Sequence, residues 1–384
     1  VDLPVPTEHV NVDPKPAVCA QLAENPEVVA YFETILAQWC TLVDRVLTDE
    51  TRTDSDADGP DAELEYWRSR MAKLNSISEQ TKSKPAKVLF GVLLACRSKV
   101  YKAWRQIDTR ITDVSNEAKD NVKYLITLEN SLEPMYNGTP TQVIDAMPSL
   151  MNNVKMMHTI ARYYNTSERM TPLMSKITNQ LIANCKSHIE ADGKLWDQDL
   201  PSLIAKLEVT IKVRGRYEEE YNLTKARAQQ QAGKGQVVFR FDEPTIFKKF
   251  NLFIKRVQKL LSMFTTAEQL GSLAKHTHIE GLEAVIKRFA EITDDMKRKP
   301  YDLLDFYDAK FDRDLMDFEV QIHDLETQLQ SFINSAFEHI TNTEQALNLL
   351  QQFQTVLQRD SLKSDLQDKY MQLMATHQSL LDEH

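Results

Sequence analysis

Apolar residues recur every three or four positions along most of this chain, which is the spacing of one face of an α-helix. The clearest case predicts a long helix over residues 104–132. Its apolar positions are Trp104, Ile107, Ile111, Val114, Ala118, Leu125, Leu128 and Leu132. Asn121 is a single gap in this stripe. Stripes of this regularity bury against neighbouring helices in coiled-coil-like seams.

The same spacing predicts helices over most of the remaining chain. They cover residues 26–46, 64–84, 150–164, 170–189, 200–232, 247–264 and 311–336, with a last pair after Thr341-Asn342. Strand-like alternation is nearly absent, and glycine accounts for only 9 of 384 residues, so strained turns are few. We therefore predict an all-α fold, an elongated string of antiparallel helical bundles.

Proline-rich and polar stretches divide the chain. The expected parts are an extended linker (1–25), a helix plus an acidic loop (26–62), a first set of bundles (63–231), a loop (232–241) and a second set of bundles (242–384). The chain starts at valine and stops inside a helical pattern, so we expect it to be an excerpt of a longer polypeptide and the last bundle to continue beyond it.

The net charge limits the kinds of partner to be expected, and the cysteine content indicates the redox compartment. A net charge of −10 argues against steered binding to nucleic acid, to an anionic membrane or to an acidic polymer, and favours protein partners contacted through local patches. The four cysteines form no CxxC pair, which fits a reducing compartment such as the cytoplasm. The sequence contains neither a run of 18 apolar residues nor a signal segment at its start.

One stretch matches the calcium loop of EF-hands, which needs oxygen ligands at alternate positions, a glycine at the sharp turn and a closing glutamate. The ligand candidates are Asp54, Asp56, Asp58 and Glu65, with Gly59 at the turn. Pro60 takes the seventh place and Asp61 the eighth, where an apolar residue is usual, and a second loop is missing. A solvated acidic linker explains the stretch more simply, and calcium binding is the alternative.

Other short motifs lack the residues that their chemistry needs. The glycines and lysine of 233–236 have no Walker frame, and Asp294-Asp295 lacks a third acid. His276 and His278, followed by Glu280, would point to different sides of a helix, and no further His or Cys lies nearby. We interpret these as a flexible loop, a helix-end charge cluster and a polar turn. We predict no catalytic residue, no cofactor-binding residue and no metal site beyond the acidic candidate.

The stretch RYYNTSERMT (162–171) lies between two apolar stripes. It contains a glycosylation acceptor pattern, but nothing routes the chain to the secretory pathway. We predict a corner, where Asn165 caps the next helix and Glu168 reaches back to the cap in a capping box. Tyr164, just before the cap, is expected to pack on the new helix as a staple.

Several long segments together resemble a known family. They are ELEYWRSRMAKLNSISEQ (63–80), DTRITDVSNEAKDNVKYLITLE (108–129), MPSLMNNVKMMHTIARYYNTSERMTPLMSKITNQLIANCK (147–186), LWDQ (195–198) and IFKKFNLFIKRVQKLLSMFTT (246–266). These segments resemble the N-terminal tail, or stem, of axonemal dynein heavy chains, most of all the outer-arm gamma type. The resemblance covers residues 26–384.

The resemblance implies a non-catalytic tail segment. It implies association with other heavy chains, with intermediate and light chains and with docking-complex proteins, at the axoneme of a cilium or flagellum. The motor ring that uses ATP and Mg, and the microtubule-binding stalk, would lie elsewhere in the parent chain. The alternatives are a calcium-responsive helical module using the Asp54–Glu65 loop and, with the least support, an all-α enzyme.

Overall fold

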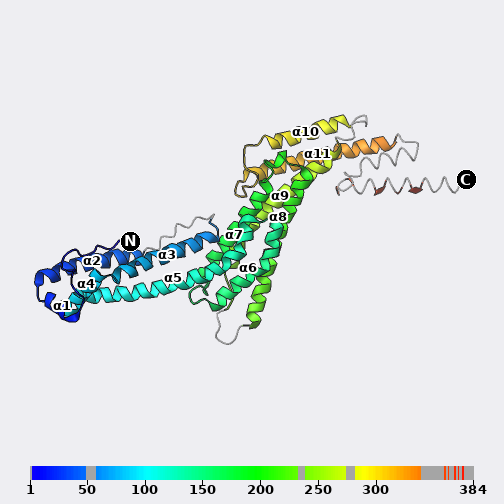
Figure 1. Ribbon diagram of the computed structural model, residues 1–384. Coiled ribbons are helices and arrows are strands. Elements are labelled where there is room, and N and C mark those ends of the chain that lie inside the picture. The colour runs from blue at the N-terminus through cyan, green and yellow to red at the C-terminus, as the bar shows by residue number, and fades with distance from the viewer. Residues whose placement is uncertain are drawn as a thin grey trace. The chain divides into compact units, whose positions relative to one another are not determined.

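The computed structural model describes residues 2–48, 58–231, 238–273 and 282–338, and the single or paired residues 359, 362, 367, 368, 371, 374 and 375. The helices are α1 (Pro16–Leu22), α2 (Pro26–Thr48), α3 (Pro60–Thr81), α4 (Lys84–Ala95), α5 (Lys99–Asn137), α6 (Pro140–Ile160), α7 (Ser167–Glu190), the 3-10 turn η1 (Leu195–Asp197), α8 (Leu200–Gln231), α9 (Glu243–Gly271), α10 (Glu283–Lys297) and α11 (Lys310–Glu338) (Figure 1). No strand occurs in these ranges, which confirms the all-α prediction. None of the helices described is long and apolar enough to cross a bilayer.

The chain divides into two compact units that interleave in sequence. Unit 1 contains Val1–Leu181 and Arg216–Phe247, and unit 2 contains Ile182–Gly215 and Lys248–His384. The loop expected at 232–241 as a boundary therefore falls inside unit 1. Helices α7, α8 and α9 each contribute residues to both units. A boundary within a continuous helix leaves no proline, glycine or polar cluster to mark it in the sequence.

Helix starts follow local capping chemistry. Ser83 Oγ accepts from Ala86 N–H (3.4 Å) and begins α4, whose first turn holds a proline. Thr139 and Gln142 form a capping box at α6, with Thr139 N–H donating to Gln142 Oε1 at 2.8 Å. Both starts place proline where its missing N–H costs no hydrogen bond.

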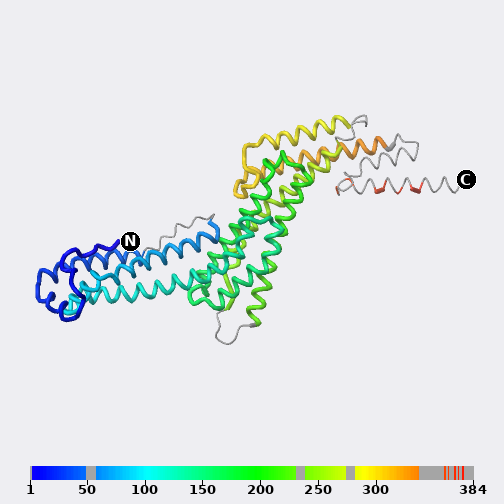
Figure 2. Tube along the Cα trace, in the orientation of Figure 1, coloured from blue at the N-terminus to red at the C-terminus, as the bar shows by residue number. Residues whose placement is uncertain are grey.

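The N-terminal residues are not a free extended linker, as the prolines suggested. Leu3 is buried, and its N–H donates to Gln80 Oε1 at 2.7 Å. Trp39 Nε1–H donates to the Pro4 carbonyl at 2.8 Å, and residues from Pro16 onward form α1. The dark blue trace in Figure 2 follows this arm beside α2. Proline removes a donor but keeps its carbonyl, so side chains of α2 and α3 satisfy the arm's backbone.

The aromatic core of unit 1 joins α2, α4 and α5. Trp39 and Trp104 meet edge to face with ring centroids 5.8 Å apart, and Phe90 stacks on Trp104 at 5.7 Å. The predicted seam on α5 is confirmed at Trp104, Ile111, Ala118, Leu125, Leu128 and Leu132, all of which are buried. α5 packs against α2, α3 and α6 and so serves as the central helix of this unit.

Gly91 marks the closest approach of α1 to α4. A Cβ added there would lie 2.5 Å from Cys19 Sγ. We expect Gly91→Ala to lower the free energy of unfolding by about 1–3 kcal/mol through overpacking. Thermal unfolding followed by circular dichroism measures this.

The matched control is Gly215→Ala in α8, where nothing lies within 4 Å of the added Cβ. That change should stabilise the chain by about 0.5–1 kcal/mol through helix propensity. Adding Cys19→Ala to Gly91→Ala should recover part of the loss. Equal effects of the two glycine substitutions would contradict the close contact.

The polar residue that interrupts the apolar stripe of α5 is buried. Asn121 is fully buried, and neither Oδ1 nor Nδ2 has a hydrogen-bond partner within the described protein. An unsatisfied buried amide costs free energy, so we expect Asn121→Leu to stabilise unit 1 by about 1–3 kcal/mol. Urea titration measures it, with the exposed Asn116→Leu as the near-neutral control. A loss of stability at 121 would mean that the amide is bonded after all.

Candidate functional site

A buried carboxylate lies at the centre of unit 1. Glu63, near the start of α3, is 1% exposed. Its Oε1 accepts from Trp67 Nε1–H at 3.0 Å and from the Tyr164 hydroxyl through a short hydrogen bond, and its Oε2 accepts from Lys176 Nζ at 2.9 Å. One side chain thus bonds to the first turns of α3, to the 161–166 corner and to α7. Buried charges occur where they are paired and hydrogen-bonded, as this one is.

A second layer of polar contacts surrounds this carboxylate. The Arg169 guanidinium lies 4.9 Å from the centre of the Trp67 ring and forms an ion pair with Glu117 of α5 at 2.7 Å. Asn179 Nδ2 donates to the Asp58 carbonyl at 2.9 Å. These contacts link α3, α5 and α7 around the corner. We use the name Glu63 joint for the inner group of four residues, Glu63, Trp67, Tyr164 and Lys176.

The corner itself departs from the predicted capping box. Helix α7 begins at Ser167, and Met170 N–H donates to the Thr166 carbonyl at 2.9 Å, so Thr166 precedes the first helical residue. Asn165, the predicted cap, therefore lies one residue before the N-cap position of α7. Glu168 is the second helical residue, whereas a capping box needs it to be the third. Tyr164 is buried and bonds to Glu63 of α3, a contact that the local pattern did not indicate. The tertiary bond sets the position of the corner, and local pattern cannot show it.

The calcium candidates are only partly described. Asp54 and Asp56 lie outside the described residues. Asp58 directly precedes Gly59, and α3 already begins at Pro60, the seventh place of the pattern, which leaves Glu65 on an exposed helical position. Within the described ranges no three His, Cys, Asp or Glu side chains gather as a metal site. Calcium binding at Asp54–Glu65 stays a prediction.

Of the remaining short motifs, the structure describes only the acidic pair at the end of α10. Residues 232–236 and the set His276, His278 and Glu280 lie outside the described residues. Asp294 pairs with Lys297 (3.8 Å) and Asp295 with Lys299 (3.3 Å) where α10 ends, which confirms the helix-end charge cluster.

In unit 2, the LWDQ motif forms the turn between α7 and α8. Gln198 Nε2 donates to the carbonyls of Ile189 and Gly193, both at 2.8 Å, and satisfies the end of α7. Lys206 of α8 donates to Gln198 Oε1 at 3.0 Å and pairs with Asp192 at 2.6 Å. Gly193 has φ of +99°, where a side chain would be strained. Trp196, the second residue of the motif, lies in the same turn.

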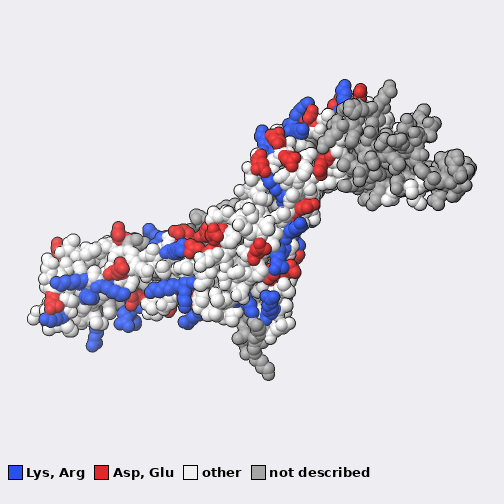
Figure 3. Space-filling model, turned by 45° about the vertical axis from the view of Figure 1, so that its right-hand side comes forward, with Lys and Arg blue, Asp and Glu red and all other residues white. Residues whose placement is uncertain are grey.

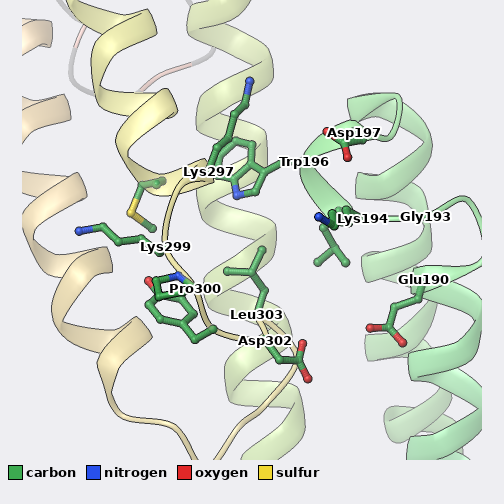
Figure 4. Close-up of a pocket in the computed structure, with 13 residues that line it drawn as sticks. Glu190, Gly193, Lys194, Trp196, Asp197, Lys297, Lys299, Pro300, Asp302 and Leu303 are labelled. Carbon is green, nitrogen blue, oxygen red and sulfur yellow. The ribbon is translucent and has the colours of Figure 1, made fainter.

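A recess of about 590 Å³ lies between this turn and the segment that follows α10 (Figure 4). Trp196 borders it, with its ring against Phe264 at 4.7 Å and Lys297 Nζ 5.8 Å above it. Figure 4 shows Glu190 and Lys194 on one side and Lys299 on the other. Lys299 pairs with both Asp295 and Asp314 at 3.3 Å, so its charge holds the segment after α10 in place.

A buried arginine organises the connection between α10 and α11. Arg256 of α9 is 3% exposed and donates to the carbonyls of Asp308 (2.6 Å) and Leu303 (3.4 Å). Its guanidinium lies 4.3 Å from the centre of the Phe311 ring. Sequence reasoning identified neither Arg256 nor Glu63 as special, because each lies among charged residues that look like a solvated helix face.

Two compact units of packed helices, each with a buried and hydrogen-bonded charged side chain, make the described part of this chain an all-helical protein. The family model "Dynein heavy chain, N-terminal region 1" matches residues 29–383. The chain belongs to this family of dynein heavy-chain N-terminal regions.

Individual relatives agree with the family. The chain is 47% identical over 371 residues (96% of this chain) to "Dynein gamma chain, flagellar outer arm" of Chlamydomonas reinhardtii. It is 39% identical over 337 residues (87%) to "Dynein axonemal heavy chain 5" of Rattus norvegicus, and 39% over 336 residues (86%) to "Dynein axonemal heavy chain 8" of Homo sapiens. The matches cover 8%, 10% and 7% of those relatives. The predicted resemblance to the axonemal, outer-arm gamma type is confirmed.

Proposed function

We propose that this segment is a non-catalytic scaffold in the tail of an outer-arm axonemal dynein heavy chain. The observation that carries the proposal is the similarity of 96% of the chain to an outer-arm gamma chain. The buried Glu63 and Arg256 networks support it, because fully bonded polar clusters hold helices in one arrangement. A scaffold must present its partner surfaces at constant spacing, and such clusters provide this.

The partners in this proposal are other dynein heavy chains, intermediate and light chains, and docking-complex proteins. The segment would act in the cytoplasm during assembly and at the axoneme of a cilium or flagellum afterwards, where it would anchor the motor to the doublet microtubule for ciliary beating. ATP and Mg would be used in the motor region of the parent chain, and this segment would hold no cofactor.

Crosslinking mass spectrometry of the assembled outer-arm complex tests the proposal. We expect crosslinks between residues 63–264 and intermediate-chain or docking-complex sequences. The isolated 384-residue chain should show no nucleotide turnover. A complex in which this segment crosslinks only to its own chain, or a fragment that hydrolyses ATP, would contradict the proposal.

A further inference from the structure

One stretch of unit 1 is basic in an otherwise acidic chain. Between Lys82 and Ile107 the sequence contains no Asp or Glu, although the whole chain has a net charge of −10. The basic residues of this stretch are Lys82, Lys84, Lys87, Arg97, Lys99, Lys102 and Arg105, and all seven are exposed. We call them the α4–α5 basic face, since they lie on or next to these two helices.

The described residues offer these cations no acidic partner. In the described parts of the chain none of the seven forms an ion pair, whereas Arg110, further along α5, pairs with Asp44 at 2.6 Å. Figure 3 shows many Lys and Arg side chains along the lower edge of unit 1, with a few Asp and Glu side chains among them. Unpaired like charges this close together along the chain repel each other, so a negatively charged partner would relieve them.

The turn between α4 and α5 places one of these cations at a strained position. Ser98 N–H donates to the Leu93 carbonyl (3.0 Å) and Arg97 N–H to the Leu94 carbonyl (3.1 Å), which is the Schellman pattern of a helix end. Arg97 therefore has φ of +56°, in the left-handed region where glycine is preferred. An arginine kept at a glycine position costs stability, which points to a role for its charge.

An exposed apolar side chain lies beside this arginine. Leu94, in the last turn of α4, is 58% exposed. A leucine three residues before Arg97, at the end of a helix rich in lysine, offers an apolar contact close to positive charge. Recognition of a peptide by such a surface needs acidic residues around one apolar anchor.

We infer that the α4–α5 basic face binds an acidic segment of a partner polypeptide, with Leu94 contacting an apolar side chain of that segment. A narrow segment fits better than a membrane or a nucleic acid duplex, since those extended anionic surfaces would also meet the acidic remainder of the chain. The inference rests on the proposed scaffold function and assigns the chemistry of one of its contacts.

The test uses the 384-residue chain and a fluorescent glutamate-rich peptide with a leucine at every fourth position. We expect binding that weakens steeply as salt rises. The triple variant Lys84→Gln, Lys87→Gln and Lys102→Gln should bind about tenfold more weakly. The matched control neutralises three exposed lysines elsewhere, Lys212, Lys248 and Lys287, and should bind as the parent does.

Arg97→Gly separates binding from folding. It should raise the melting temperature, because glycine adopts the left-handed conformation without strain, and should still weaken peptide binding. A peptide that keeps the leucines but has glutamine in place of every glutamate should not bind. Unchanged affinity in both the triple variant and Arg97→Gly would overturn the inference.

Three further arms distinguish other occupants. Equal or tighter binding of phosphatidylserine vesicles, or of duplex DNA, would overturn the assignment to a polypeptide. Self-association of the chain that the triple variant abolishes would assign the face to a second copy and overturn it too. The binding tests can contradict this inference while the crosslinks of residues 63–264 to other subunits are still observed. In that case the peptide-binding assignment is wrong and the proposed scaffold function is unaffected.

Discussion

Glu63→Gln is expected to lower the free energy of unfolding of unit 1 by about 3–5 kcal/mol, because it leaves Lys176 Nζ charged and buried without its carboxylate. Lys176 is 6% exposed and cannot turn to water without opening the contact between α3 and α7. Denaturant unfolding followed by tryptophan fluorescence measures the change. Hydrogen exchange should localise the loss to α3 and to the corner around Tyr164.

An exposed ion pair between α3 and α5 gives the control. Arg68 and Glu129 lie 3.1 Å apart with 41% and 49% of their side chains exposed, so Glu129→Gln should change stability by less than about 1 kcal/mol. Lys176→Met combined with Glu63→Gln should cost less than the sum of the two single changes, because neither charge is then left alone. If Glu63→Gln proves as mild as Glu129→Gln, the joint does not hold the corner.

Arg256→Met is expected to lower the free energy of unfolding of unit 2 by about 2–5 kcal/mol, because two backbone carbonyls are left without a hydrogen-bond donor. The carbonyls of Asp308 and Leu303 would lose their charged donor, and the Phe311 ring would lose its cation. The stability of Arg256→Lys should lie between those of the parent chain and of Arg256→Met. An ammonium group keeps the positive charge but lacks the planar guanidinium that donates to two carbonyls at once. Faster hydrogen exchange of the backbone in residues 301–309 is the most direct measurement.

Arg288 of α10 provides the matched control for this prediction. It is 51% exposed and pairs with Glu291 at 3.4 Å, so Arg288→Met should change stability by less than about 1 kcal/mol. Slow exchange in 301–309 after Arg256→Met would mean that side chains other than Arg256 hold this connection.

Hydrophobic spacing predicted the helices well because it is a local property. The α5 stripe from Trp104 to Leu132 is buried as expected, and α11 buries Phe311, Leu315, Phe318 and Ile322 in the same way. The pattern marked Asn121 only as a gap in the apolar stripe, and the structure shows that its side chain is buried. It also missed α1, because the prolines of the first 25 residues hid a helix that packs on α4.

The site could be predicted only in part. The corner at 162–171 was found from its polar residues, but the cap fell one residue away, and the partner of Tyr164 was unforeseen. The family followed from long colinear segments, and Glu63, Trp67, Tyr164 and Lys176 all lie in them. The contacts among these four residues could not be predicted, because a single sequence does not show which distant residues lie together in the fold.

By itself, the sequence determined the all-α class, most helices and the family, because helix periodicity and capping act over three to four residues and family motifs are read in order. The tertiary structure alone decided which charged residues are buried. Glu63 meets Tyr164 across 101 residues and Lys176 across 113, whereas the cations from Lys82 to Arg105 remain in solvent. Burial depends on which helix faces meet, and that depends on the whole chain.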